Sequence, residues 1–199
     1  MRRRLLFTAL CLPLAWLGYA IAGELNQPGS VLGADPGEAV VLFLGEWGLR
    51  LLLLTLAVTP LRRLTGWAEL LGYRRMIGLF SFTYLALHLL AYVALLAEFD
   101  WRLVLEDFSD RAYITAGLIG FGLLLPLAVT STRGWQRRLG RRWRSLHRLV
   151  YPAVFLGLLH LVWLTKDGYG EVAAYGVLLS LLMVERIRHG AWWGRKAAG

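Results

Sequence analysis

The sequence predicts an all-α fold, a polytopic membrane protein built as a bundle of six transmembrane helices. Of its 199 residues 57% are hydrophobic and 18% are charged, whereas soluble domains carry about a quarter charged residues. The apolar residues form six long runs, each near the ~20 residues that cross the hydrocarbon core of a bilayer. The length fits one domain over residues 1–199.

The six predicted spans are continuous apolar runs without the alternation of membrane β-strands. They cover residues 5–22, 39–59, 76–97, 113–130, 146–164 and 172–187. The first run follows three arginines and could also be a signal peptide. Its apolar part is longer than a usual signal core and is followed by a weak cleavage site, so we expect an uncleaved first span.

The net charge is +9, and the distribution of the charged residues along the chain indicates how the predicted spans are oriented. Arginine and lysine outnumber acids in every second segment, namely the N-terminus, 60–75, 131–148 and the tail after 184. The segments between them, 24–38, 98–112 and 165–171, carry more acids than bases. The positive-inside rule therefore predicts that both termini are cytoplasmic. Because the basic residues lie between apolar runs, we interpret them as topology signals and not as a nucleic-acid surface.

Two histidines lie deep in predicted spans of the same direction. His88 follows Arg75 by about 20 Å of helix and His160 follows Arg148 by about 18 Å, at 1.5 Å per residue. Imidazoles at matched depth on two helices could supply both axial ligands of a haem that carries electrons. Alternatively, each ring donates a hydrogen bond to a backbone carbonyl of a neighbouring helix.

A third histidine, His147, lies among arginines at the predicted cytoplasmic mouth of the fifth span. Its distance from His160 would suit a second haem, and His147 is a possible ligand there. The matching level of the third span holds Arg74 and Arg75 and no histidine. An interfacial histidine that contacts solvent or a haem propionate is the alternative interpretation.

One charged pair lies inside the second predicted span. Glu46 and Arg50 are four residues apart and share a helix face. Charged groups inside a span are costly and often functional. The pair could contact a haem propionate or a quinone, or it could be a structural ion pair.

Seven segments resemble the MsrQ family, also called YedZ, in order over most of the chain. They are LGADPGEAV (32–40), LLLLTLAVTPL (51–61), RRMIGLFSFTYLALHLLAY (74–92), RAYITAG (111–117), LAVTST (127–132), RRLGRRWRSLHRLVY (137–151) and LHLVW (159–163). The resemblance implies a ferric-reductase-like transmembrane haem domain. It places the family's haem histidines on His88, His147 and His160. Relatives with two complete haem sites have two histidines on the third span, where this chain has one. The resemblance also implies b-type haem and FMN, with no FMN fingerprint in the chain.

By the same resemblance we expect an electron-transfer subunit in the bacterial inner membrane. It would carry electrons from the quinone pool or a cytoplasmic flavin reductase to the periplasmic molybdopterin enzyme MsrP, its heterodimer partner. MsrP would then reduce methionine sulfoxide in oxidised periplasmic proteins. The alternatives are a ferric reductase-like oxidoreductase that acts at the outer face, and a non-redox transport or structural membrane protein.

Overall fold

The structure is a computed structural model that describes residues 1–166 and 168–188, and all regular secondary structure in these residues is helical. The α-helices are α1 (Arg2–Asn26), α2 (Pro36–Thr65), α3 (Leu70–Ala91), α4 (Trp101–Asp110), α5 (Ala112–Val129), α6 (Arg133–Leu139), α7 (Arg141–Leu146), α8 (Val150–Leu164) and α9 (Gly170–Arg188). A π-helical segment, Tyr92–Leu96, extends α3, and a 3₁₀ turn, His147–Leu149, precedes α8.

Five helical stretches within the described residues are long and apolar enough to cross a membrane. They are Arg2–Asn26, Pro36–Thr65, Leu70–Leu96, Ala112–Val129 and Arg141–Leu164. These stretches cover the first five predicted spans, and they make the chain a multi-pass membrane protein. Helix α9 covers the predicted sixth span, 172–187, but is not among the five. It carries four charged residues near its ends, so a six-span count stays a prediction.

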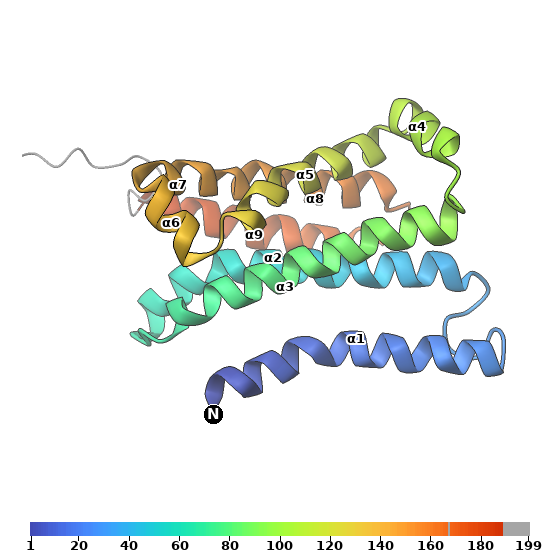
Figure 1. The fold of residues 1–199 in the computed structure, drawn as a ribbon, viewed down its shortest axis with the longest axis horizontal. Coiled ribbons are helices and arrows are strands. Elements are labelled where there is room, and N and C mark those ends of the chain that lie inside the picture. Colours follow the sequence, from blue (N-terminus) through green and yellow to red (C-terminus); the bar gives the residue numbers. More distant parts are fainter. Residues whose placement is uncertain (167, 189–199) are drawn as a thin grey trace, which may run out of the picture.

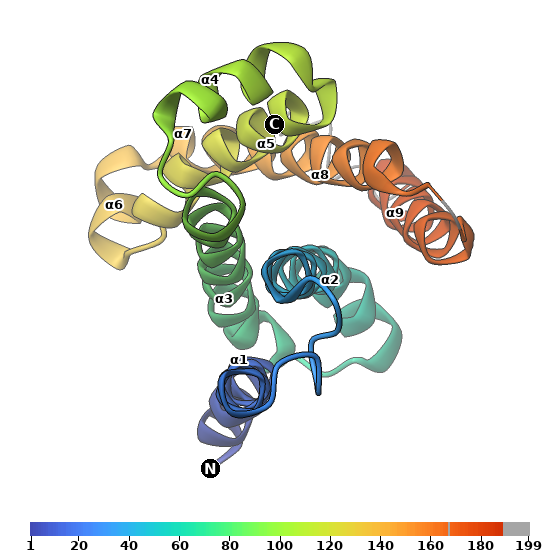
Figure 2. The same cartoon turned by 90° about the vertical axis from the view of Figure 1, so that its right-hand side faces the viewer.

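The long helices run side by side along one axis (Figure 1). Seen end-on, α1 lies on one side of the α2–α3 pair, and α5, α8 and α9 lie on the other (Figure 2). One buried cluster joins leucines and valines of α2, α5, α8 and α9, and a second joins α1, α2 and α3. The fully buried Tyr84 ties α3 to α1, since its hydroxyl donates to the carbonyl of Leu10 at 2.9 Å.

The ends of α2 follow from local sequence. The Asp35 side chain accepts the N–H of Glu38 at 2.9 Å, and Pro36 follows it in the first turn. An aspartate cap followed by proline is a strong helix start. The helix ends at Gly66, whose φ of 71° is the left-handed conformation in which glycine has no steric penalty.

The fifth predicted span, 146–164, is not one continuous α-helix. A 3₁₀ turn over His147–Leu149 separates α7 from α8. Pro152 explains the break, because it has no N–H to donate and its ring would clash with the carbonyl of Arg148 four residues earlier. Proline is tolerated in the first turn of a new helix, which is where α8 places it.

Three short helices lie in segments predicted only as connections. Helix α4 closes one end of the bundle, and α6 and α7 lie at the opposite end (Figure 1). We call these the α4 end and the α6–α7 end. Asp100 caps α4 by accepting the N–H groups of Arg102 and Leu103 at 2.8 and 3.3 Å. The side chain of Thr132 caps α6 in the same way through Trp135.

Candidate functional site

A cavity of about 400 Å³ lies between α2, α3, α5 and α8 toward the α4 end. We call it the histidine cavity, because His88 and His160 both line it. Most of its other walls are apolar or lack a side chain: Val41, Gly45, Leu49, Leu52, Leu85, Leu89, Gly117, Phe121, Leu124, Ala153, Gly157 and Leu161. Such walls suit a flat apolar ligand that approaches helix backbones closely.

The two imidazole rings lie close to each other, although they come from α3 and α8. Their centres are 6.1 Å apart and their planes are nearly perpendicular, at 85°. With metal–nitrogen bonds of about 2 Å and ring centres roughly 1 Å behind each nitrogen, two imidazoles on opposite sides of one metal have centres about 6 Å apart. The spacing of His88 and His160 therefore fits the two axial positions of a single iron.

Each of these rings uses one nitrogen to bond to backbone. The Nδ1 atom of His88 lies 2.8 Å from the carbonyl oxygen of Val41, and Nδ1 of His160 lies 2.6 Å from that of Tyr113. A carbonyl accepts only from N–H, so the proton belongs on Nδ1 and the lone pair on Nε2. The alternative raised from the sequence, a hydrogen bond from each ring to a backbone carbonyl of a neighbouring helix, is therefore present. These hydrogen bonds leave Nε2 of both rings free to bind a metal.

Each ring also packs against a glycine of the neighbouring helix. A Cβ added to Gly45 would lie 2.9 Å from Nδ1 of His88, and one added to Gly117 would lie 3.0 Å from Nδ1 of His160. Each glycine lies four residues after the carbonyl that its histidine contacts. The α2–α3 pair and the α5–α8 pair therefore hold their histidines in the same way, and both need a residue without a side chain.

A polar cluster closes the histidine cavity at the α4 end. Asp107 of α4 is 7% exposed, accepts the hydroxyl of Tyr92 at 2.7 Å and pairs with Arg111 at 2.9 Å. The hydrogen bond to Tyr113 and the charge of Asp107 raise the pKa of Arg111 further above its usual value. Asp107 and Arg111 both line the cavity. The ion pair that they form near the C-terminal end of α4 therefore lies over this end of the cavity.

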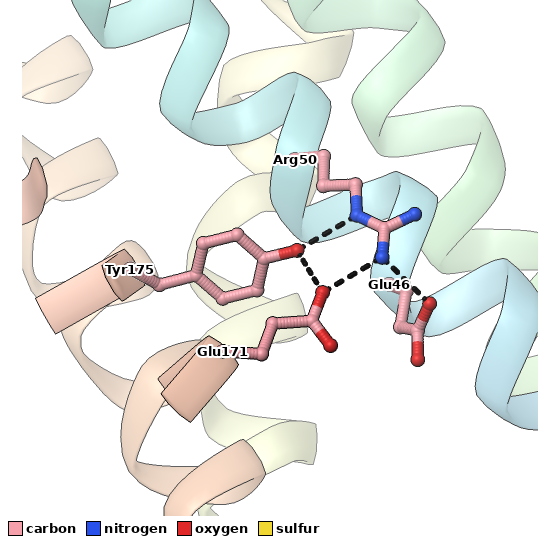
Figure 3. A network of polar contacts seen from close by, with 4 residues as sticks. All are labelled: Glu46, Arg50, Glu171 and Tyr175. Atoms are coloured by element: carbon pink, nitrogen blue, oxygen red, sulfur yellow. Dashed lines mark hydrogen bonds and ion pairs between the residues drawn. The ribbon is translucent and has the colours of Figure 1, made fainter. Parts of the chain in front are cut away.

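Glu46 and Arg50 form the predicted ion pair, at 2.9 Å (Figure 3). Arg50 also contacts two residues of α9, Glu171 at 2.7 Å and the hydroxyl of Tyr175 at 2.7 Å. Tyr175 in turn donates to Glu171 at 2.5 Å. One arginine therefore pairs with two carboxylates and ties α9 to α2. No sequence pattern pointed to the α9 partners, which are more than 120 residues away.

The Arg50→Gln variant should be less stable, by about 2 kcal/mol, because two carboxylates lose a charged donor. Thermal unfolding of the purified protein in detergent measures the change. Arg102→Gln is the matched control, since Arg102 is 87% exposed and pairs with Glu106 four residues on. Such exposed pairs contribute less than about 1 kcal/mol. Equal unfolding temperatures for the two variants would show that the Arg50 network does not stabilise the bundle.

A second cavity, of about 540 Å³, lies toward the α6–α7 end. We call it the arginine cavity, because five arginines line it: Arg74, Arg75, Arg144, Arg148 and Arg186. His147 also lines it, with its ring stacked on Trp143 at 3.9 Å and its Nδ1 atom 3.1 Å from the Trp143 carbonyl. No other histidine of the described part of the chain lines this cavity.

The two cavities are neighbours along the bundle. Leu52 and Leu124 line both of them. The ring of Phe82, in the arginine cavity, stacks on that of Phe121, in the histidine cavity, with centres 5.3 Å apart. The structure therefore brings His88 and His160 together and places His147 in the separate, adjacent cavity.

Comparison with known proteins agrees with this architecture. Residues 44–158, which run from α2 into α8, contain His88 and end just before His160, match the family described as ferric reductase like transmembrane component. No solved structure matches the chain significantly.

Three relatives illustrate the likeness over nearly the whole chain. A Rhodospirillum rubrum protein is 49% identical over 91% of this chain and 85% of its own length. A Caulobacter vibrioides protein is 46% identical over 98% and 88%, and one from Xanthomonas campestris pv. campestris is 45% identical over 96% and 85%. Each is named protein-methionine-sulfoxide reductase heme-binding subunit MsrQ. The chain belongs to the MsrQ family of ferric-reductase-like transmembrane proteins.

Proposed function

We propose that the chain binds a b-type haem in the histidine cavity and transfers electrons as the membrane subunit of a methionine sulfoxide reductase system. The observation that carries this proposal is the pair of imidazoles 6.1 Å apart across an apolar cavity. His88 and His160 are the proposed axial ligands. The names of the relatives, which describe heme-binding subunits, support the same cofactor.

When bound between two imidazoles, a b-type haem supplies a one-electron carrier with no open position on its iron. The residues of the chain set its environment. The carbonyls of Val41 and Tyr113 orient the two rings by accepting their Nδ1–H groups. The leucines of the cavity exclude water, and helix α4 covers the opening through Asp107. This arrangement favours electron transfer over the binding of oxygen or substrate at the metal.

We further propose six spans, with α9 as the sixth and both termini on the cytoplasmic side of the bacterial inner membrane. The two acidic side chains of α9 are compatible with a span because each has an arginine partner in the bundle. Glu171 pairs with Arg50 at 2.7 Å, and Glu185 pairs with Arg63. The arginines of 133–148 collect at the α6–α7 end, which is then the cytoplasmic side.

The histidine cavity then lies near the periplasmic side, where the α4 end would meet the proposed partner MsrP. Exposed acids of α4 and its flanks support this surface as the docking site: Glu98, Asp100, Glu106 and Asp110. The electron donor is the quinone pool or a cytoplasmic flavin reductase, and FMN is the proposed second cofactor. His147, in the arginine cavity, is the proposed ligand of a haem on the cytoplasmic side.

The visible spectrum of the purified protein, oxidised and reduced, tests this function. We expect the low-spin spectrum of a b-type haem, and reoxidation of the reduced haem when MsrP and methionine sulfoxide are added. A colourless protein would support the transport or structural alternative. A haem that is reoxidised by ferric iron and not by MsrP would support the ferric reductase alternative.

A further inference from the structure

The arginine cavity has a strong excess of positive charge. Five arginines line it, and its described lining residues include no aspartate or glutamate. Side chains that could accept hydrogen bonds face it too, but none of them is a carboxylate: Thr55, Ser81, Ser131, Gln136, His147 and Tyr151. No described lining residue supplies a counter-charge, so the cavity favours an anionic ligand.

Arg186 is the most unusual of these residues. It is 5% exposed, and it is held by the hydroxyl of Tyr151 at 2.6 Å and the carbonyl of Leu56 at 3.1 Å. Its Nε–H is buried and has no acceptor among the described residues. Burying a guanidinium that has an unused donor and only neutral partners is strongly unfavourable, unless a bound anion accepts the free N–H and balances the charge.

Arg74 faces the same cavity from α3 and is half-buried. Neither Arg74 nor Arg186 takes part in any ion pair formed within the described residues. The carboxylate next to Arg186 in sequence, Glu185, pairs instead with Arg63. Two guanidinium groups from α3 and α9 therefore converge on one space without a carboxylate between them.

We propose that Arg186 and Arg74 form an anion receptor that binds the carboxylate or phosphate of a planar aromatic cofactor in the arginine cavity. Guanidinium groups recognise both anions through paired N–H donors. The aromatic walls suit a planar ligand, because Phe82 and the stacked rings of Trp143 and His147 line the cavity. The choice of a redox cofactor rests on the proposed function. The acidic group comes from either of two sources, a haem propionate or a flavin phosphate.

Matched pairs of ligands test the receptor in the full chain purified in detergent. FMN is compared with riboflavin, which lacks the phosphate, and haem with its dimethyl ester, which lacks free carboxylates. We expect the acidic member of one pair to bind at least tenfold more tightly than the neutral member. The pair that shows the preference identifies the source of the acidic group. The haem and flavin content of the purified chain is measured beside the titrations.

The variants Arg186→Gln and Arg74→Gln should each reduce that preference to about onefold and lower the content of the cofactor in the arginine cavity at least tenfold. Arg186→Lys should retain part of the preference, because it keeps the charge and loses the fork of donors. Arg141→Gln is the control. Arg141 is an exposed arginine of α7 that does not line the cavity, and its loss should change neither quantity.

The low-spin haem spectrum of the histidine cavity serves as the internal control for folding. It should be unchanged in all four variants. A chain that lacks this spectrum but still prefers the acidic ligands would refute the proposed function and leave the receptor intact. The receptor is refuted if the acidic and neutral members bind wild-type protein equally, or if both glutamine variants keep the preference and the full cofactor content.

Discussion

His88→Ala and His160→Ala should each lose the low-spin haem of the histidine cavity, with haem affinity there reduced at least about tenfold. Removing a group that merely orients a metal-ligating histidine lowers metal affinity by about 10–100-fold, and these substitutions remove the ligand itself. The two rings lie 6.1 Å apart on opposite helices, so either loss leaves one side of the metal without a protein ligand. Haem content and the reduced spectrum of each purified variant measure the effect.

Exogenous imidazole supplies the control for this prediction. In His88→Gly and His160→Gly, added imidazole should enter the space left by the ring and restore the low-spin spectrum. His147→Ala should leave that spectrum unchanged, because His147 lines the arginine cavity. Full low-spin haem in either alanine variant would contradict the assignment of these two ligands.

Gly45→Val and Gly117→Val should lose most of the same haem without any change to a histidine. A Cβ at Gly45 would lie 2.9 Å from Nδ1 of His88, and one at Gly117 would lie 3.0 Å from Nδ1 of His160. Because neither backbone can move away without disrupting its helix pair, the ring must rotate or leave its carbonyl partner. Overpacking of this kind costs about 1–3 kcal/mol, which corresponds to about a 5–150-fold loss of affinity.

Gly122→Val is the matched control for the glycine variants. Gly122 belongs to α5, as Gly117 does, but a Cβ added there would meet nothing within 4 Å. It should bind haem as the wild-type protein does. Equal haem content in Gly117→Val and Gly122→Val, measured as haem per chain after purification, would show that the close approach of helix and ring is not required.

Much of the fold follows from hydropathy. The long apolar runs predicted the five membrane-length helices, because a bilayer demands continuous stretches that satisfy their own backbone hydrogen bonds. Helix α4 was missed, because an amphipathic helix of ten residues has no long apolar run. Its capping residue Asp100, directly before Trp101, was the available signal. The break before α8 follows from Pro152 itself, because proline has no N–H to donate and its ring would clash with the carbonyl of Arg148.

The proximity of His88 and His160 could be predicted from the sequence. His88 and His160 stand out because polar groups are rare in spans, and similar distances from the basic ends predicted similar depth. Gly45 and Gly117 carry no such signal, since glycine is common in membrane helices. Arg186 lies in a basic tail and was interpreted as a topology signal. Its burial depends on α9 packing against α2 and α8, a long-range contact that no local pattern specifies.

The central claim is that one iron takes both of its axial ligands from His88 and His160. Near-infrared magnetic circular dichroism of the oxidised, purified protein tests it most directly, because the charge-transfer band reports the identity of both axial ligands. The band of bis-imidazole ligation, absent in His88→Ala and in His160→Ala, is the predicted result. The absence of a bis-imidazole band in the wild-type protein, or a bis-imidazole band that persists in either variant, would contradict the claim.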